Sequence, residues 1–151
     1  MEQRSPEWFA SRLGKVTASM VTTVASKSVA RKKYLNQLIT ERLTGRAVPV
    51  YVNQAMQHEI KCPQLLTHTE VLATQDINIK YQHQMQWQLA CMPERKWCDF
   101  VSYHPDFPDE HKLLILRVDR DDELINSLEV EVKKFLNEVD EALNFINNKE
   151  K

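Results

Sequence analysis

Glycine is almost absent from this chain, which has only Gly14 and Gly45 among its 151 residues. Globular proteins usually contain about 7% glycine. Tight hairpin turns and β-bulges use much of it, because glycine adopts positive φ without steric strain. A chain with so little glycine is either mostly helical or has lost its hairpins, and composition alone leaves both alternatives open.

Hydrophobic spacing predicts more helices than strands. Gly45 directly follows the periodic segment 31–44, at the position where glycine commonly ends a helix. Ser5 and Pro6 are typical of a helix start. We expect helices over residues 5–14, 17–24, 31–44, 64–73, 79–92 and 121–146, and strands over 59–62, 97–103 and 112–118. This order of segments supports an α+β domain.

Two of these segments carry expectations about burial. The apolar face of the 79–92 helix is expected to hold Tyr81, Met85, Leu89 and Met92. In the 97–103 strand, apolar side chains occupy both alternating sets of positions. They are Trp97, Val101 and Tyr103 on one side and Cys98 and Phe100 on the other. A strand of this kind is expected to be buried on both faces.

The composition is that of a soluble globular domain, with 42% hydrophobic and 27% charged residues. No apolar run approaches the roughly 20 residues of a membrane helix, and the N-terminus lacks the apolar core of a signal peptide. The three cysteines have no CxxC or histidine pairing and are interpreted as reduced thiols. We therefore expect one cytoplasmic domain over residues 1–151, with no membrane partner.

The small net charge of −1 hides an asymmetry between two parts of the chain. Residues 1–61 contain ten Lys and Arg against four Asp and Glu, a balance of +6. Residues 62–151 contain ten against seventeen, a balance of −7. A basic half can attract phosphate groups, so nucleic acid is one partner that the sequence suggests. Chance clustering of charges is the alternative.

Glu59 and Lys61 are the residues most suggestive of catalysis. In a strand, residues i and i+2 share a face, so this carboxylate and this ammonium group would lie together. Mg²⁺-dependent hydrolysis of a phosphodiester needs hard oxygen ligands and a cation near the attacking water. The same Glu-x-Lys or Glu-Arg-Lys spacing also occurs at 94–96 and 131–133. Taken alone, the spacing is therefore interpreted as a solvated strand face.

Four short blocks in a fixed order change that interpretation. They are WFASRLGKVTAS at 8–19, EIKCP at 59–63, YQHQMQWQ at 81–88 and WCDFVSY at 97–103. In these blocks the chain resembles the phage lambda exonuclease family, the YqaJ-type viral recombinases of the PD-(D/E)xK nuclease superfamily. The resemblance spans most of the chain. It implies a restriction-endonuclease-like core, with a small sheet flanked by helices and a long C-terminal helix.

The resemblance also implies a metal site and a catalytic lysine. Glu59 would hold Mg²⁺, or Mn²⁺ in its place, with the Ile60 carbonyl as a further ligand. Lys61 would position the nucleophilic water. These roles come from the family pattern, matched position by position to the Glu-Ile-Lys block.

Three further roles follow from the resemblance. Arg12 and Ser19 would bind the 5′-terminal phosphate of DNA, a task suited to a guanidinium fork and a hydroxyl at a helix start. Gln84 would contact the scissile phosphate or the water, with Tyr81 one turn before it. Without the family context, Gln84 is equally interpreted as a surface glutamine of an amphipathic helix.

The chain departs from the family pattern at one point. In the family, a helix and a hairpin with two acidic metal ligands separate the segment NQAMQH, here at 53–58, from the Glu-x-Lys strand. Here His58 runs directly into Glu59. We interpret this junction as an internal deletion of about 30–50 residues, the length of such elements, so that the core is truncated.

The sequence therefore suggests an internally deleted, phage-type alkaline exonuclease, as found in a prophage remnant. The activity implied is Mg²⁺-dependent 5′→3′ digestion of double-stranded DNA ends. Its partners would be a single-strand annealing protein and two further copies in a homotrimer. Loss of two acidic ligands is expected to impair catalysis. The alternatives are a non-catalytic DNA-binding or interaction remnant, and a pseudogene product without function.

Overall fold

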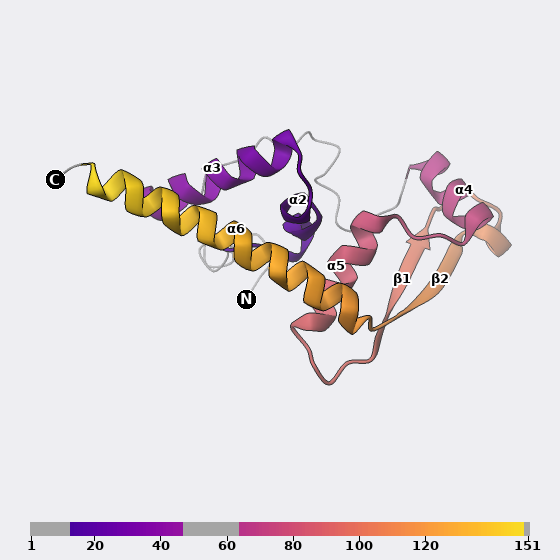
Figure 1. Cartoon of the computed structure of the whole chain (residues 1–151). Coiled ribbons are helices and arrows are strands. Elements are labelled where there is room, and N and C mark those ends of the chain that lie inside the picture. Colours follow the sequence, from indigo (N-terminus) through magenta and orange to yellow (C-terminus); the bar gives the residue numbers. More distant parts are fainter. Residues whose placement is uncertain (1–12, 47–63, 150–151) are drawn as a thin grey trace. The chain divides into compact units, whose positions relative to one another are not determined.

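The computed structural model describes residues 13–46 and 64–149, which form helices and one two-stranded antiparallel sheet (Figure 1). The elements in chain order are η1 (Ala18–Met20), α2 (Val21–Ala25), α3 (Val29–Thr44), α4 (Leu65–Thr74), α5 (Ile79–Ala90), β1 (Trp97–Tyr103), η3 (Asp109–His111), β2 (Leu113–Asp119) and α6 (Asp122–Asn148). The fold is thus α+β, as predicted. In the described ranges, no helix is both long and apolar enough to cross a membrane.

The chain divides into two compact units, which are described separately. The first unit comprises Met1–Val50 and Glu123–Lys151, and the second comprises Tyr51–Asp122. The expected deletion junction at 58–59 and the expected helix 5–14 and strand 59–62 lie outside the described residues, apart from the end of that helix. The prediction of one domain over 1–151 therefore stays a prediction.

The core of the first unit lies between α3 and α6. Helix α3 is capped at its start by Ser28, whose hydroxyl accepts the Arg31 N–H, and at its end by Gly45, with φ of +64°. Tyr34 of α3 stacks on Phe135 of α6, with ring centroids 5.5 Å apart. The other buried apolar side chains of this unit are Val21, Val24, Leu38, Ile125, Leu128, Val132 and Val139. The predicted helices 31–44 and 121–146 are confirmed within a few residues.

The second unit places α4 and α5 against the sheet. Strands β1 and β2 pair antiparallel, from Trp97 opposite Asp119 to Tyr103 opposite Leu113. The ring of Tyr81 on α5 lies 5.8 Å from that of Phe100 on β1. His68 on α4 is fully buried, and its Nδ1 lies 2.7 Å from the Ser102 hydroxyl of β1. The helices therefore cover the even-numbered side of β1.

The prediction that β1 is buried on both faces is wrong. Trp97, Val101 and Tyr103, on the odd-numbered side, are 46%, 53% and 43% exposed. Only the side that α4 and α5 contact is packed. Met92 is also exposed, against expectation, because α5 ends at Ala90 and the chain turns away before it.

Gln86 fixes the end of β2 relative to α5. Its amide nitrogen donates to the Asp119 carbonyl at 2.7 Å, and its amide oxygen accepts the Asp121 N–H at 2.9 Å. The side chain is 3% exposed. A buried glutamine with both ends paired is a structural residue, because removing it leaves backbone groups without partners.

Candidate nuclease site

Gln84 lines a groove of about 810 Å³ formed by α4, α5 and β1 in the second unit. Lys80, Tyr81 and Gln88 line the same groove from α5. Residues three or four positions apart share one side of a helix, which explains why this row faces a single cavity. The groove thus brings together an ammonium group, a phenol and two carboxamides, which can donate hydrogen bonds to phosphate oxygens.

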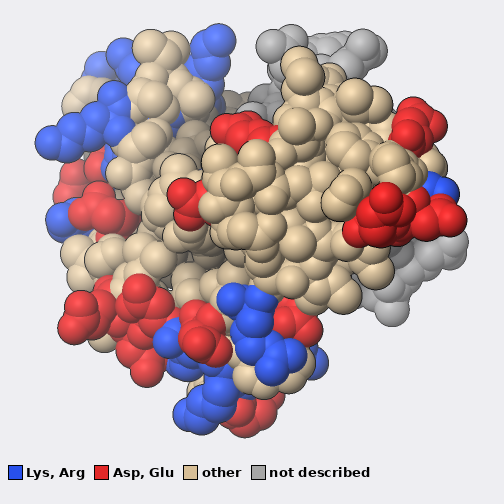
Figure 2. All heavy atoms as spheres, turned by 90° about the vertical axis from the view of Figure 1, so that its right-hand side faces the viewer, with Lys and Arg blue, Asp and Glu red and all other residues tan. Residues whose placement is uncertain are grey.

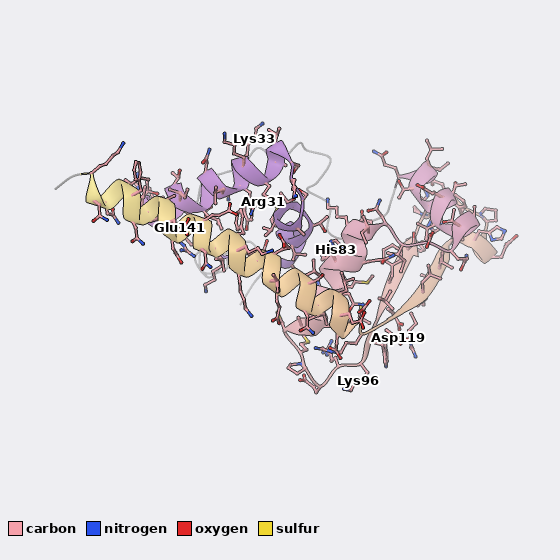
Figure 3. All side chains as sticks on the ribbon, in the orientation of Figure 1. Arg31, Lys33, His83, Lys96, Asp119 and Glu141 are labelled. Atoms are coloured by element: carbon pink, nitrogen blue, oxygen red, sulfur yellow. The ribbon has the colours of Figure 1, made fainter. Side chains whose placement is uncertain are left out.

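Burial shifts the pKa of two titratable groups, one on α5 and one on β1, in the direction that favours the neutral form. His83 lies within α5 (Figure 3), and burial lowers the pKa of its imidazole below the ordinary value of 6.5. Burial also raises the pKa of the Cys98 thiol, which lines the groove from β1. A thiol that stays protonated is a poor nucleophile and a poor metal ligand.

Three acidic residues line the groove, Glu70, Asp76 and Asp99, and the side chain of Asp99 belongs to the exposed, odd-numbered side of β1. The Asp99 carboxylate accepts a hydrogen bond of 3.1 Å from Nε of Arg117. The central carbon of the same guanidinium lies 3.8 Å from the centre of the Trp97 ring. Asp99 is therefore engaged in an ion pair across the two strands. Among residues 13–46 and 64–149, no group of three or more His, Cys, Asp or Glu side chains could hold a metal ion.

Ser19 lies in the first unit, on the single turn η1. Its side chain is half-buried, and its hydroxyl oxygen is 3.3 Å from that of Thr17. Either hydroxyl can be the donor, so a ligand can still accept a hydrogen bond from this pair. The predicted helix over 17–24 is confirmed as η1 followed by α2.

The structure describes two of the six predicted site residues, Ser19 and Gln84. The other four, Arg12, Glu59, Ile60 and Lys61, lie outside the described residues. Ser19 and Gln84 belong to different units, and each is placed only within its own unit. Their predicted roles therefore stay predictions.

Sequence reasoning missed Lys80, which lines the groove with Gln84. The signal was present, since Lys80 and Gln84 are four residues apart in a predicted helix. It also missed the role of Glu41, whose partner stands 27 residues away in the chain. No local pattern encodes such a contact.

Charge is mixed on the face of the molecule in Figure 2. Uncharged side chains form a broad area there, and Lys and Arg lie among Asp and Glu around it. This face does not present one sign of charge.

Comparison with solved structures relates the fold of this chain to a nuclease. The chain is 33% identical to an alkaline exonuclease, LHK-Exo, from Laribacter hongkongensis, with a TM-score of 0.84. The match covers 96% of this chain and 97% of that one. A second structure of LHK-Exo, in complex with dAMP, matches equally well.

The chain therefore belongs to the alkaline exonuclease family, and the predicted nuclease relationship is confirmed. No family model matches the sequence. None of the curated proteins gives a significant match either.

Proposed function

We propose that this protein binds the ends of double-stranded DNA as a phage-type alkaline exonuclease whose catalysis is severely impaired. The observation that carries the first half is the 33% identity to LHK-Exo over nearly the whole chain. The groove beside Gln84, with Lys80 and Tyr81, supports it, because these side chains can contact a phosphodiester. The LHK-Exo structure with dAMP shows that this neighbour accepts a nucleotide.

The impairment follows from the ligands available for Mg²⁺. This ion prefers six oxygen ligands and gives up its waters reluctantly, so it needs more than one carboxylate to stay in place. At the Glu59 block the sequence offers one carboxylate and the Ile60 carbonyl, because His58 directly precedes Glu59. Asp99, which lines the groove, is already paired with Arg117. The donor set does not fit a tightly held Mg²⁺.

Family membership supports the remaining features of the proposal. The 5′→3′ polarity, the homotrimer, the single-strand annealing partner and the recombination role all derive from the resemblance to phage exonucleases. The prophage origin and the deletion at 58–59 rest on the same comparison of blocks. A non-catalytic DNA-binding remnant is the alternative, and the basic balance of residues 1–61 favours it.

Two assays on the purified protein test the proposal together. Fluorescence anisotropy with a blunt, 5′-phosphorylated duplex should detect binding in Ca²⁺ or EDTA, which support no cleavage. Incubation of the same duplex with Mg²⁺ or Mn²⁺ should release little or no mononucleotide. Binding without digestion supports the proposal. Absence of binding at low salt would contradict the proposed binding of DNA ends. Tight Mg²⁺ binding, measured by calorimetry, would contradict the proposed loss of catalysis.

A further inference from the structure

Glu41 is an unusual residue for the middle of a helix that packs into a core. It is 5% exposed, although it carries a carboxylate. Its Oε1 accepts the Gln37 amide at 2.8 Å, and its Oε2 accepts the Gly14 N–H at 2.9 Å. A buried carboxylate is costly unless it is hydrogen-bonded, so this one holds its partners firmly.

The Gly14 turn is fixed to α3 by more than this one bond. Gly14 has φ of +65°, and a Cβ there would lie 3.0 Å from Cγ of Arg42. The Arg42 guanidinium approaches the Gly14 carbonyl at 3.4 Å, and the Tyr34 hydroxyl donates to the Lys15 carbonyl at 3.1 Å. Glu41 and Arg42 lie seven and eight residues after Tyr34, so all three share one side of α3.

The chain beyond Ser19 is fixed to the same helix. Val21 and Val24 are fully buried, and Nε of Arg31 donates to the Val24 carbonyl at 3.0 Å. Arg31 also pairs with Glu138 of α6 through two hydrogen bonds of 2.8 and 2.7 Å. In Figure 3, Arg31 extends from α3 toward α6, whereas Lys33 points away. Both flanks of the Ser19 turn are therefore held by α3.

We propose that Glu41 is a positioning residue for the 5′-terminal phosphate, because its buried carboxylate fixes the Gly14 turn that leads into Ser19. This inference rests on the proposed function, binding of DNA ends, and on the role that the family resemblance implies for Ser19 at that phosphate. A phosphate is recognised by donors in fixed places, so a loose turn loses discrimination before it loses charge attraction. The Glu41 charge is engaged by the Gly14 N–H and the Gln37 amide.

The test compares three variants by their preference for a phosphorylated end. Glu41→Ala removes both acceptors, whereas Glu41→Gln keeps an amide oxygen that can accept the Gly14 N–H. Leu128→Ala is the control, since it opens the core of the same unit from α6 and leaves the Gly14–Glu41 hydrogen bond in place. Anisotropy gives the ratio of Kd for 5′-hydroxyl and 5′-phosphate duplexes at one salt concentration.

The Glu41→Ala change should reduce this ratio about tenfold, as loss of a charge-assisted hydrogen bond implies. Glu41→Gln should keep most of the ratio, and Leu128→Ala should keep it despite a lower Tm. Should Glu41→Ala not fold, Gly14→Ala disturbs the same contact and should lower the ratio likewise. If the wild-type protein prefers the phosphorylated end and neither Glu41→Ala nor Gly14→Ala changes its Kd ratio, the positioning role alone is overturned. If the wild-type protein itself shows a Kd ratio of one, the phosphate role of Ser19 is overturned, and this inference with it.

Discussion

At the scale of single residues, charged side chains tie α3 to α6 in the first unit. The Arg31 guanidinium holds the pKa of the Glu138 carboxyl below its ordinary value of 4.5 by hydrogen bonding. The pKa of Arg31 is raised in turn, and its guanidinium lies 5.0 Å from the centre of the Phe135 ring. Glu138 is about two-fifths exposed, so solvent screens part of this attraction.

A lowered carboxyl pKa makes the first unit sensitive to acid. The stabilisation by Glu138 is complete above the unfolded pKa near 4.5 and is lost as the pH falls through the lower folded value. Replacing it, Glu138→Gln, should lower the free energy of unfolding at about pH 7 and flatten its fall below about pH 4.5. Urea titrations at both pH values measure this. Glu141→Gln, on an exposed position of the same helix, is the control, and equal effects of both changes would contradict the account.

At the scale of elements, the shortage of glycine has a visible consequence. Helix α4 ends at Gln75 in the left-handed conformation, with φ of +57°, where glycine is usual. A side chain in this region costs about 1–2 kcal/mol. The side-chain amide of Gln75 donates a hydrogen bond of 2.9 Å to the Leu72 carbonyl, which offsets part of that cost.

Replacing this residue, Gln75→Gly, should therefore raise the free energy of unfolding by about 0.5–1 kcal/mol, since the strain outweighs one exposed hydrogen bond. Chemical denaturation of the second unit's helices, followed by circular dichroism, measures the change. Gln88→Gly, on an exposed position inside α5, should lower stability instead. A loss of stability with Gln75→Gly would mean that the Leu72 contact dominates.

The elements also show how far the sequence can be read. Helical spacing located α3, α4, α5 and α6, because an apolar stripe reports which side is packed. Short runs rich in apolar residues located β1 and β2, but did not give the burial of β1. That depends on what covers each face, and α4 and α5 cover only one. Gly14 was visible as a glycine, yet its bond to Glu41 joins residues that no local pattern connects.

At the scale of the whole molecule, charge is divided along the chain, with +6 in residues 1–61 and −7 in the rest. Binding to DNA through the basic part releases counterions from the phosphate backbone. The affinity for duplex DNA should therefore fall steeply as salt is added, and log Kd should rise linearly with the logarithm of the salt concentration. Anisotropy between about 50 and 200 mM salt measures the slope. A slope near zero would contradict binding through the basic part.

The family relationship could be read from four short blocks, whereas the fate of catalysis could not. The sequence shows that His58 adjoins Glu59, but only an activity measurement can show whether one carboxylate is enough to bind Mg²⁺ for cleavage. Each Lewis-acid contribution of a metal to phosphoryl chemistry is worth several kcal/mol. Losing about 5 kcal/mol slows cleavage by roughly three to four powers of ten.

Single-turnover digestion of a linear, 5′-phosphorylated duplex with Mg²⁺ tests this central claim most directly, with Glu59→Ala measured alongside. We predict a rate about three to four powers of ten below that of LHK-Exo under the same conditions, and almost no further loss with Glu59→Ala. Digestion at a rate comparable with LHK-Exo, abolished by Glu59→Ala, would show that other acids complete the metal site and would contradict the account.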